Sequence, residues 1–427
     1  MRLMFATIPL AIFALETAAA NAGVFTTLYS FGGYPGDATS PQSKLVIGEN
    51  GLIQNGILYG TSGYGGRYGA GTVFSLTPPV PPGGSWTETV LWSFGGAGDG
   101  EFPYDGAVLI GPGGALFGTT MSGGAYGWGA VYSLAPPAAQ GGSWTETLYS
   151  FTGGAGGSGP EGDLAIDVAG ALYGTTMGGG TAGLGTVFRL SPPRSAGAPR
   201  TETVLYSFMG GSDGAVPTAG VVVGNGGVLY GTTFQGGSAG YGTVFSLTPP
   251  ASRGAPWDEA VIHSFAGSPD DGVNAFAGLI IGNRRILYGT TISGGRARGG
   301  VVFSLKPPSS PGGDWTETVL HNFGAGPQAR RGWEPWGGLV LREGTDILYG
   351  TTEFTANAGR GHGDGILFAL PSVSPGSEPT MRILHEFAGS DGAEPNAGVV
   401  QASSGIFYGT TENGGAQNRG TVFSYEP

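Results

Sequence analysis

One short motif, Leu-Tyr-Gly-Thr-Thr with small variations, returns about every 58 residues, and this periodicity limits the possible folds more than any other feature. Its aromatic residue lies at Tyr59, Phe117, Tyr173, Tyr230, Tyr288, Tyr349 and Tyr408. Self-similarity at such a period is typical of solenoids, propellers and arrays, in which each repeat is one supersecondary unit. The fold therefore has to be predicted from the repeat before any single residue is given a role.

Three other apolar segments accompany the motif in a fixed order. Around Tyr230 these are residues 219–223, before the motif, and 242–247, after it; residues 201–208 show the segment that closes a repeat. Each is short, rich in β-branched and aromatic residues, and bounded by Gly, Pro, Asn or Asp, which indicates strands. We name the four strands A, B (the motif), C and D. Four antiparallel strands per repeat predict one propeller blade.

The two ends of the sequence hold complementary parts of one repeat. Residues 24–31 read as a strand D without A, B or C before it, and residues 420–425 read as a strand C without D after it. Pairing these segments would close a ring and remove its exposed edges. The sequence therefore predicts an all-β, seven-bladed β-propeller of four-stranded blades, in which the N-terminal strand joins the three C-terminal strands. A β-solenoid and two smaller units are the alternatives.

The first residues have the pattern of a secretory signal peptide. Arg2 precedes the apolar run 3–15, and Ala18–Ala20 or Ala20–Ala22 fits the small-residue cleavage pattern. The run is shorter than the ~20 residues of a membrane-spanning helix. We expect a signal peptide over 1–22, a single propeller domain over 23–427, secretion to the extracellular space or periplasm, and no membrane insertion after cleavage.

Composition and charge exclude some classes of function. Gly and Pro are abundant, but 40% hydrophobic and 11% aromatic residues suffice to bury a core. The net charge of −12 argues against a nucleic-acid partner, because binding phosphates requires a basic surface. The chain has no Cys, so neither disulfides nor thiolate metal sites are available. We expect a monomer without cofactor.

The repeat resembles a known family in its string of motifs: Leu-Tyr-Gly-Thr-Thr, Gly-Gly, Gly-Thr-Val-Phe, Thr-Glu-Thr-Val-Leu-Tyr-Ser-Phe and Asp-Gly-x-x-Pro. In this order it is similar to the Gloeo/Verruco repeat of bacterial extracellular proteins, over residues 24–427. The resemblance implies a secreted, propeller-like repeat protein of bacterial origin. It implies no catalytic residues.

Most residues with chemical potential follow the repeat and are interpreted as structural. His263, His321 and His385 replace the aromatic residue of strand D, and no histidine cluster suggests a metal site. Asp-Gly at Asp99, Asp213, Asp271 and Asp391 suits tight turns; calcium is the alternative, best supported by Asp99, Glu101 and Asp105. The recurring Trp86, Trp144, Trp257 and Trp315 are expected to pack between blades.

Binding residues are expected on the face that carries the B–C and D–A loops. These loops hold Tyr, Trp and Arg, the residue types that dominate binding hot spots. The candidate ligand-binding residues are Tyr64, Tyr68, Tyr126, Trp128, Tyr241, Arg296, Arg298, Trp333, Trp336, His362 and Arg419. We expect a binding or scaffolding module for a glycan or an envelope protein. The alternatives are a propeller enzyme acting on polysaccharide, as lyase or hydrolase, and a structural spacer; no catalytic residue is assigned.

Overall fold

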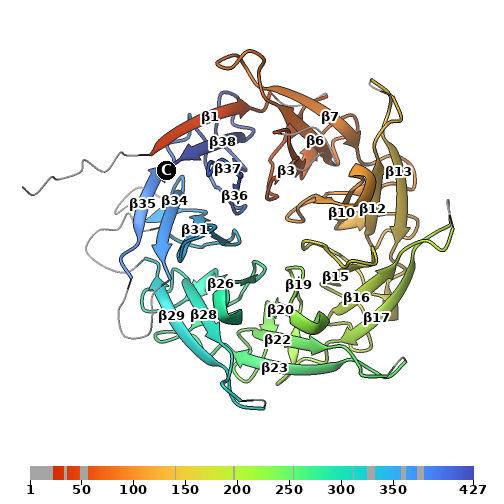
Figure 1. Cartoon of the computed structure of the whole chain (residues 1–427), viewed down its shortest axis with the longest axis vertical. Coiled ribbons are helices and arrows are strands. Elements are labelled where there is room, and N and C mark those ends of the chain that lie inside the picture. The colour runs from red at the N-terminus through yellow and green to blue at the C-terminus, as the bar shows by residue number, and fades with distance from the viewer. Residues whose placement is uncertain are drawn as a thin grey trace, which may run out of the picture.

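The computed structural model describes residues 23–32, 36–48, 56–139, 141–195, 198–252, 254–310, 312–324, 332–356, 362–372 and 379–427. Seven four-stranded antiparallel sheets surround a central axis like the blades of a propeller (Figure 1). The predicted fold is confirmed. The predicted signal peptide over 1–22 lies outside the described residues. Within them, no helix is both long and apolar enough to cross a membrane.

Every blade uses its four strands in the same order from the axis outward, and we number the blades from one to seven along the chain. Strand A is β3 (Val46–Ile47), β9 (Leu109–Ile110), β14 (Ala165–Ile166), β19 (Val222–Val223), β25 (Ile280–Ile281), β30 (Val340–Leu341) and β36 (Val400–Gln401). Strand B is β4 (Leu58–Ser62), β10 (Leu116–Thr120), β15 (Leu172–Thr176), β20 (Leu229–Thr233), β26 (Leu287–Thr291), β31 (Ile347–Thr352) and β37 (Phe407–Thr411). Strand C is β6 (Thr72–Thr77), β12 (Ala130–Ala135), β16 (Thr186–Ser191), β22 (Thr243–Thr248), β28 (Val301–Lys306), β34 (Ile366–Pro371) and β38 (Thr421–Glu426). Strand D is β7 (Thr87–Ser93), β13 (Thr145–Ser150), β17 (Thr201–Ser207), β23 (Asp258–Ser264), β29 (Thr316–Asn322), β35 (Arg382–Glu386) and, in blade seven, β1 (Val24–Ser30).

The ring closes as predicted. β1 pairs antiparallel with β38, so that Phe25 lies opposite Tyr425 and Ser30 lies opposite Thr421. Strand A differs from its prediction, because only Val222 and Val223 of residues 219–223 pair with strand B. The carbonyl of Ala219 instead accepts a hydrogen bond from Thr175 of the preceding blade.

The Leu-Tyr-Gly-Thr-Thr motif owes its glycine and its first threonine to contacts between strands and blades. A Cβ on Gly231 would lie 2.5 Å from Cζ of Phe245 in strand C, so only glycine leaves room for that ring. The first threonine donates its hydroxyl to a carbonyl of the next blade. These donors and acceptors are Thr61 and Gly106, Thr119 and Gly162, Thr175 and Ala219, Thr232 and Ala277, Thr290 and Gly337, Thr351 and Ala397, and Thr410 and Ser43. We call this set the threonine ring.

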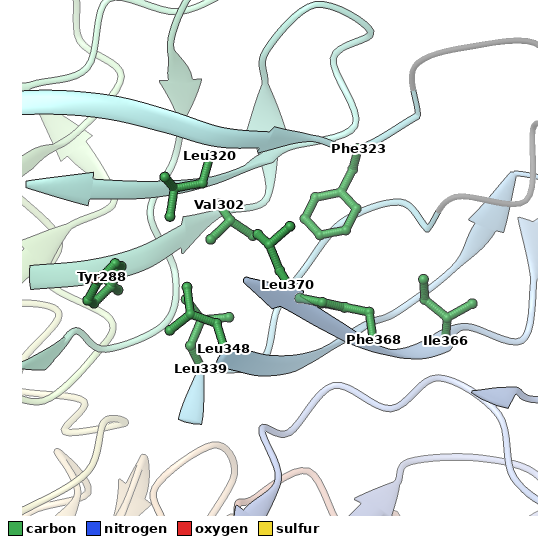
Figure 2. Packing of buried hydrophobic residues seen from close by; sticks show 9 residues of the cluster. All are labelled: Tyr288, Val302, Leu320, Phe323, Leu339, Leu348, Ile366, Phe368 and Leu370. Carbon is green, nitrogen blue, oxygen red and sulfur yellow. The ribbon is translucent and has the colours of Figure 1, made fainter. Parts of the chain in front are cut away.

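A second ring of contacts is aromatic. The Phe that follows strand D packs obliquely or edge-on against the strand C aromatic residue of the next blade, at centroid distances between 5.1 and 5.4 Å. Figure 2 shows one such interface, where Tyr288, Val302, Leu320 and Phe323 of blade five pack against Leu348, Ile366, Phe368 and Leu370 of blade six. The recurring tryptophans also bridge blades, as predicted: Trp315 packs against Tyr230, with 5.8 Å between ring centroids.

The Asp-Gly pairs form turns. Asp213 accepts hydrogen bonds from the backbone N–H of Gly214 at 2.6 Å and from the Tyr206 hydroxyl of strand D at 3.0 Å. His263 takes the place of this tyrosine and contacts Asp271 at 3.2 Å, and His385 contacts Asp391 at 2.9 Å. The geometry supports the turn interpretation and the structural role of these histidines.

Four two-stranded sheets connect D–A loops to B–C loops, and a fifth lies within the B–C loop of blade six. The 3-10 turns η1 (Pro112–Gly114), η3 (Asn225–Gly227) and η4 (Asn283–Arg285) lie in A–B loops, and η2 (Gly154–Gly156) lies in a D–A loop. The small sheets are β2 (Ala38–Thr39) with β5 (Tyr64–Gly65), β8 (Gly100–Glu101) with β11 (Ser122–Gly123), β18 (Gly214–Ala215) with β21 (Gln235–Gly236), β24 (Gly272–Val273) with β27 (Ser293–Gly294), and β32 (Thr355–Ala356) with β33 (His362–Gly363). Because the loops pair, both kinds emerge on one face, as predicted.

Candidate functional site

The site is built at the axis, on the face of the D–A and B–C loops. One residue per blade directly precedes the carbonyl that accepts the hydrogen bond of the threonine ring. These seven equivalent residues are Gln42, Asp105, Glu161, Thr218, Phe276, Trp336 and Asn396, and we call them the axial ring. All but Glu161 line a cavity of about 160 Å³, which also contacts Lys44 and Asp163. The fold thus places six different side chains of the axial ring around one opening, which we call the axial mouth.

An acidic sector of the mouth belongs to blades six and seven. Glu353 follows strand B of blade six, and its backbone N–H donates to the Glu334 carbonyl at 2.9 Å; Glu412 and Glu394 are paired in the same way in blade seven. Asn396 donates to Glu412 at 2.6 Å. Burial, followed by the charges of Glu334, Glu394 and Glu412, raises the pKa of Glu353 to about 8. Glu353 therefore carries a proton at neutral pH.

A carboxyl pair continues the acidic sector into blades two and three. Burial, together with the charge and hydrogen bond of Glu161, raises the pKa of Asp105 well above its usual range. The pKa of Glu161 is also raised by burial, whereas its hydrogen bond with Asp105 lowers it. The two carboxyls share a proton, so one donates while the other accepts.

An aromatic sector faces this acidic arc. The rings of Phe276 and Trp336 meet edge-on at 4.5 Å between centroids, and Phe234, which follows strand B of blade four, meets Phe276 at 6.3 Å. On the side of blade two, Tyr104 is an insertion relative to the other blades. Its hydroxyl donates to the Tyr64 hydroxyl at 2.8 Å, and its ring stacks on Phe102. The mouth therefore combines flat apolar surfaces with hydrogen-bonding carboxyls.

The residues expected from the sequence divide between this mouth and the outer part of the same face. Trp336 belongs to the axial ring. Tyr64 accepts the hydrogen bond of Tyr104, which directly precedes Asp105 of the axial ring. Trp333 donates to Glu334 at 3.1 Å. Tyr126, Arg296, Arg298 and Arg419 are exposed outside the axial ring. The side chain of His362 lies outside the described part of the chain, although its backbone belongs to β33.

Three of the expected aromatic residues have a repeated packing partner. Tyr68 lies against Gly95, Trp128 against Gly153 and Tyr241 against Gly267, so a Cβ on any of these glycines would come within 3.1 Å of the aromatic side chain. Each glycine follows the Phe that ends strand D of the same blade. One side of each aromatic residue therefore covers its own D–A loop.

Sequence reasoning missed the acidic sector, the Asp105–Glu161 pair and the Phe234–Phe276 contact. A signal was present in the D–A loops. A proline precedes the axial ring position in most blades, and a small residue follows it, whereas the ring position itself is filled by a different residue type in each blade. A position that varies between flanking residues that stay the same is typical of a side chain that contacts a ligand or partner and not its own fold.

A second set of buried carboxyls lies at the outer edge of the blade interfaces. The Glu of Thr-Glu-Thr in strand D faces the D–A loop of the preceding blade. In blade four the tripeptide is Asp-Glu-Ala. The glutamates are Glu88, Glu146, Glu202, Glu259 and Glu317. Burial and then the charge of Asp99 raise the pKa of Glu146 to about 8. Burial and then Asp37 raise that of Glu88 to about 7. We call this set the outer carboxyl belt.

Fold and site together define a closed seven-bladed propeller with a single axial mouth. The family model described as the Gloeobacter/Verrucomicrobia repeat matches residues 11–245 and 195–423, so the chain belongs to this repeat family. No curated protein matches the sequence.

Solved structures with a similar chain path have low sequence identity to this one. The polysaccharide lyase Uly1 is 11% identical, with 92% of this chain and 91% of that one covered and a TM-score of 0.45. A glucose dehydrogenase is 14% identical, with 94% and 99% covered and a TM-score of 0.41. The sialidase of Trypanosoma rangeli, in complex with sialic acid, is 12% identical, with 95% and 58% covered and a TM-score of 0.42.

Proposed function

We propose that the protein is a secreted binding module that takes a neutral or cationic glycan at the axial mouth. The observation that carries this proposal is a cavity lined by Phe276, Trp336 and Asn396, whose amide connects it to the acidic sector by donating to Glu412 at 2.6 Å. Aromatic side chains bury a large apolar area with little conformational freedom to lose, which suits the C–H face of a sugar ring. Carboxyls beside them can accept or donate hydrogen bonds to sugar hydroxyls.

The charge of the mouth narrows the ligand class. The charges of Glu334, Glu394 and Glu412 act together on Glu353, and Lys44 is the one cationic residue that lines the cavity among the described residues. Like charges brought together at low dielectric are strongly unfavourable. A uronate or sialic acid is therefore a poor ligand, whereas a neutral or amino sugar is suitable.

Binding fits the carboxyl geometry better than glycoside hydrolysis does. Asp105 and Glu161 are hydrogen-bonded to each other. In glycosidases the two catalytic carboxyls are separated by about 5 Å or more, with the sugar or water between them. A pair that shares a proton is instead a hydrogen-bonding group for a bound ligand.

The experiment is a glycan array with the protein lacking residues 1–22, followed by calorimetry with the best ligand. Trp336→Ala should weaken binding at least tenfold, because it removes the largest aromatic surface of the mouth. The matched control is Tyr126→Ala, which removes an aromatic residue on the same face that is 62% exposed. Circular dichroism verifies that both variants fold. Equal affinity of the two variants, or preferential binding of polyuronates, contradicts the proposal.

A further inference from the structure

The interface between blades four and five holds a cluster of three potential metal ligands. The ligand atoms of His263, Asp271 and Glu317 all lie within 4.8 Å of one another, and no other group of three such residues comes this close in the described part of the chain. His263 lies in β23 and Asp271 in the D–A loop that follows it, whereas Glu317 comes from β29 of the next blade. The cluster thus spans two blades.

Two equivalent interfaces each lack one member of this cluster. Between blades three and four, the equivalent residues are Tyr206, Asp213 and Glu259, and the tyrosine hydroxyl simply donates to Asp213. Between blades six and seven, His385 and Asp391 are present, but Phe25 occupies the register position of the glutamate and stacks on His385 at 3.5 Å. Among the residues that the structure describes, an imidazole is combined with both carboxyls at the interface of blades four and five alone.

The geometry of the cluster suits a tetrahedral ion. Nε2 of His263 lies 3.2 Å from Oδ2 of Asp271. Two ligands bound to zinc at about 2.0–2.1 Å in tetrahedral geometry are separated by about 3.3 Å. The Oε1 atom of Glu317 is buried and has no hydrogen-bond partner. A carboxylate with one unpaired oxygen therefore lies beside two atoms that already have the separation of two zinc ligands.

Backbone groups hold Asp271 in place. The N–H of Ala266 donates to Oδ2 at 2.7 Å, and the N–H of Gly272 donates to Oδ1 at 2.6 Å. Hydrogen bonds of this kind orient metal ligands and are part of functional metal sites. The histidine and aspartate side chains are 18% and 10% exposed, so an ion can reach them while most of the site is shielded from water.

We propose that His263, Asp271 and Glu317 bind one divalent transition-metal ion of the zinc type and thereby link blade four to blade five. Imidazole nitrogen with carboxylate oxygens suits zinc and related ions, whereas calcium requires six to eight oxygen ligands.

The test measures zinc binding to the protein without residues 1–22 and without a histidine tag. After chelator treatment, calorimetry with zinc chloride should give one site per chain, and one equivalent of zinc should raise the melting temperature. His263→Tyr restores the residue type of blade three, so the variant should fold while its zinc affinity falls at least 100-fold. Glu317→Gln keeps the shape of the side chain and should weaken zinc binding at least tenfold.

His385→Tyr is the control, because it removes a histidine from an equivalent position that lacks the glutamate; it should bind zinc like the unmodified protein. The proposal is overturned if the unmodified protein binds no zinc at this stoichiometry. It is equally overturned if folded His263→Tyr and Glu317→Gln both retain its affinity, or if His385→Tyr alone loses it.

Discussion

Partly buried carboxyls occur in two regions of this propeller, and the regions differ in how often they recur. The outer carboxyl belt places a glutamate at the same position of strand D in five blades, whereas the glutamates of the acidic sector, Glu334, Glu353, Glu394 and Glu412, belong to two blades. In both regions burial is the largest cause of the raised pKa values. The comparison teaches that the local electrostatics of a carboxyl does not distinguish architecture from function, whereas its recurrence around the ring does.

The largest expected effect concerns the closure of the ring by β1 and β38, a contact whose role is purely architectural. Deleting residues 23–31 removes β1, exposes the edge of β38 and loses the burial of Phe31, which is fully buried. Each large apolar side chain stabilises the fold by about 1.5–3 kcal/mol, and total stability is about 5–15 kcal/mol. We expect an unfolded or aggregated protein by circular dichroism and size-exclusion chromatography. A cooperative melt near the parent temperature would show that closure does not stabilise the ring.

The next effect tests a position that recurs in all seven blades. Gly231→Ala forces Phe245 to move, because the new Cβ would lie 2.5 Å from its ring, and overpacking of this kind costs about 1–3 kcal/mol. Gly278→Ala is the matched control at a residue that lines the axial cavity, where the nearest atom would be 3.8 Å away. Chemical denaturation should show a clear loss for the first variant and little change for the second. Equal losses would refute the steric explanation of the motif.

A smaller effect compares the two carboxyl regions directly. In the unfolded chain a glutamate ionises near its ordinary pKa of about 4.5, but Glu146 and Glu353 in the folded protein do so near about 8. Between these values the folded state keeps a proton that the unfolded state releases, so stability falls as pH rises. Glu146→Gln and Glu353→Gln should therefore each raise the melting temperature by a few degrees at pH 8 and hardly at pH 4.5. Only Glu353→Gln should also change glycan binding. An effect of Glu146→Gln on glycan binding would contradict the assignment of the outer carboxyl belt to architecture and of the acidic sector to binding.

The smallest effect concerns the outer part of the loop face. Tyr126 is 62% exposed, and substitutions at such positions usually change stability by less than about 0.5 kcal/mol. Tyr126→Ala should leave both the melting temperature and the glycan affinity unchanged. A measurable loss of affinity would extend the site from the axial mouth to the outer loops.

The sequence predicted the architecture because a repeated motif reports its own spacing. Tyr59 to Tyr408 mark seven units, and the split unit formed by residues 24–31 and 420–425 indicates closure. The extent of strand A was wrong, because residues such as Ala219 look like strand residues but use their carbonyls in the threonine ring. The spacing of the repeat was sufficient to predict the number of blades and the closure of the ring. It was insufficient to predict which residues of strand A pair with strand B.

The candidate site was only partly predictable. Trp333 and Trp336 stood out as aromatic residues in an irregular loop, and Tyr64 was noted in a B–C loop. Glu353 and Glu412 drew no attention, because each is an ordinary charged residue after a strand and becomes unusual only when blades six and seven bring four carboxyls together. Burial and charge clustering are properties of the assembled ring, and a linear pattern does not contain them.

The pairing of β1 with β38 also has a consequence in time. Val24 lies opposite Glu426, so β38 is synthesised long after β1. At about 5–20 residues per second, roughly 20–80 s separate their appearance. During that interval β1 has an unpaired edge, and six blades can form before the seventh is complete. The synthesis of β38 therefore determines when the ring becomes a single cooperative unit.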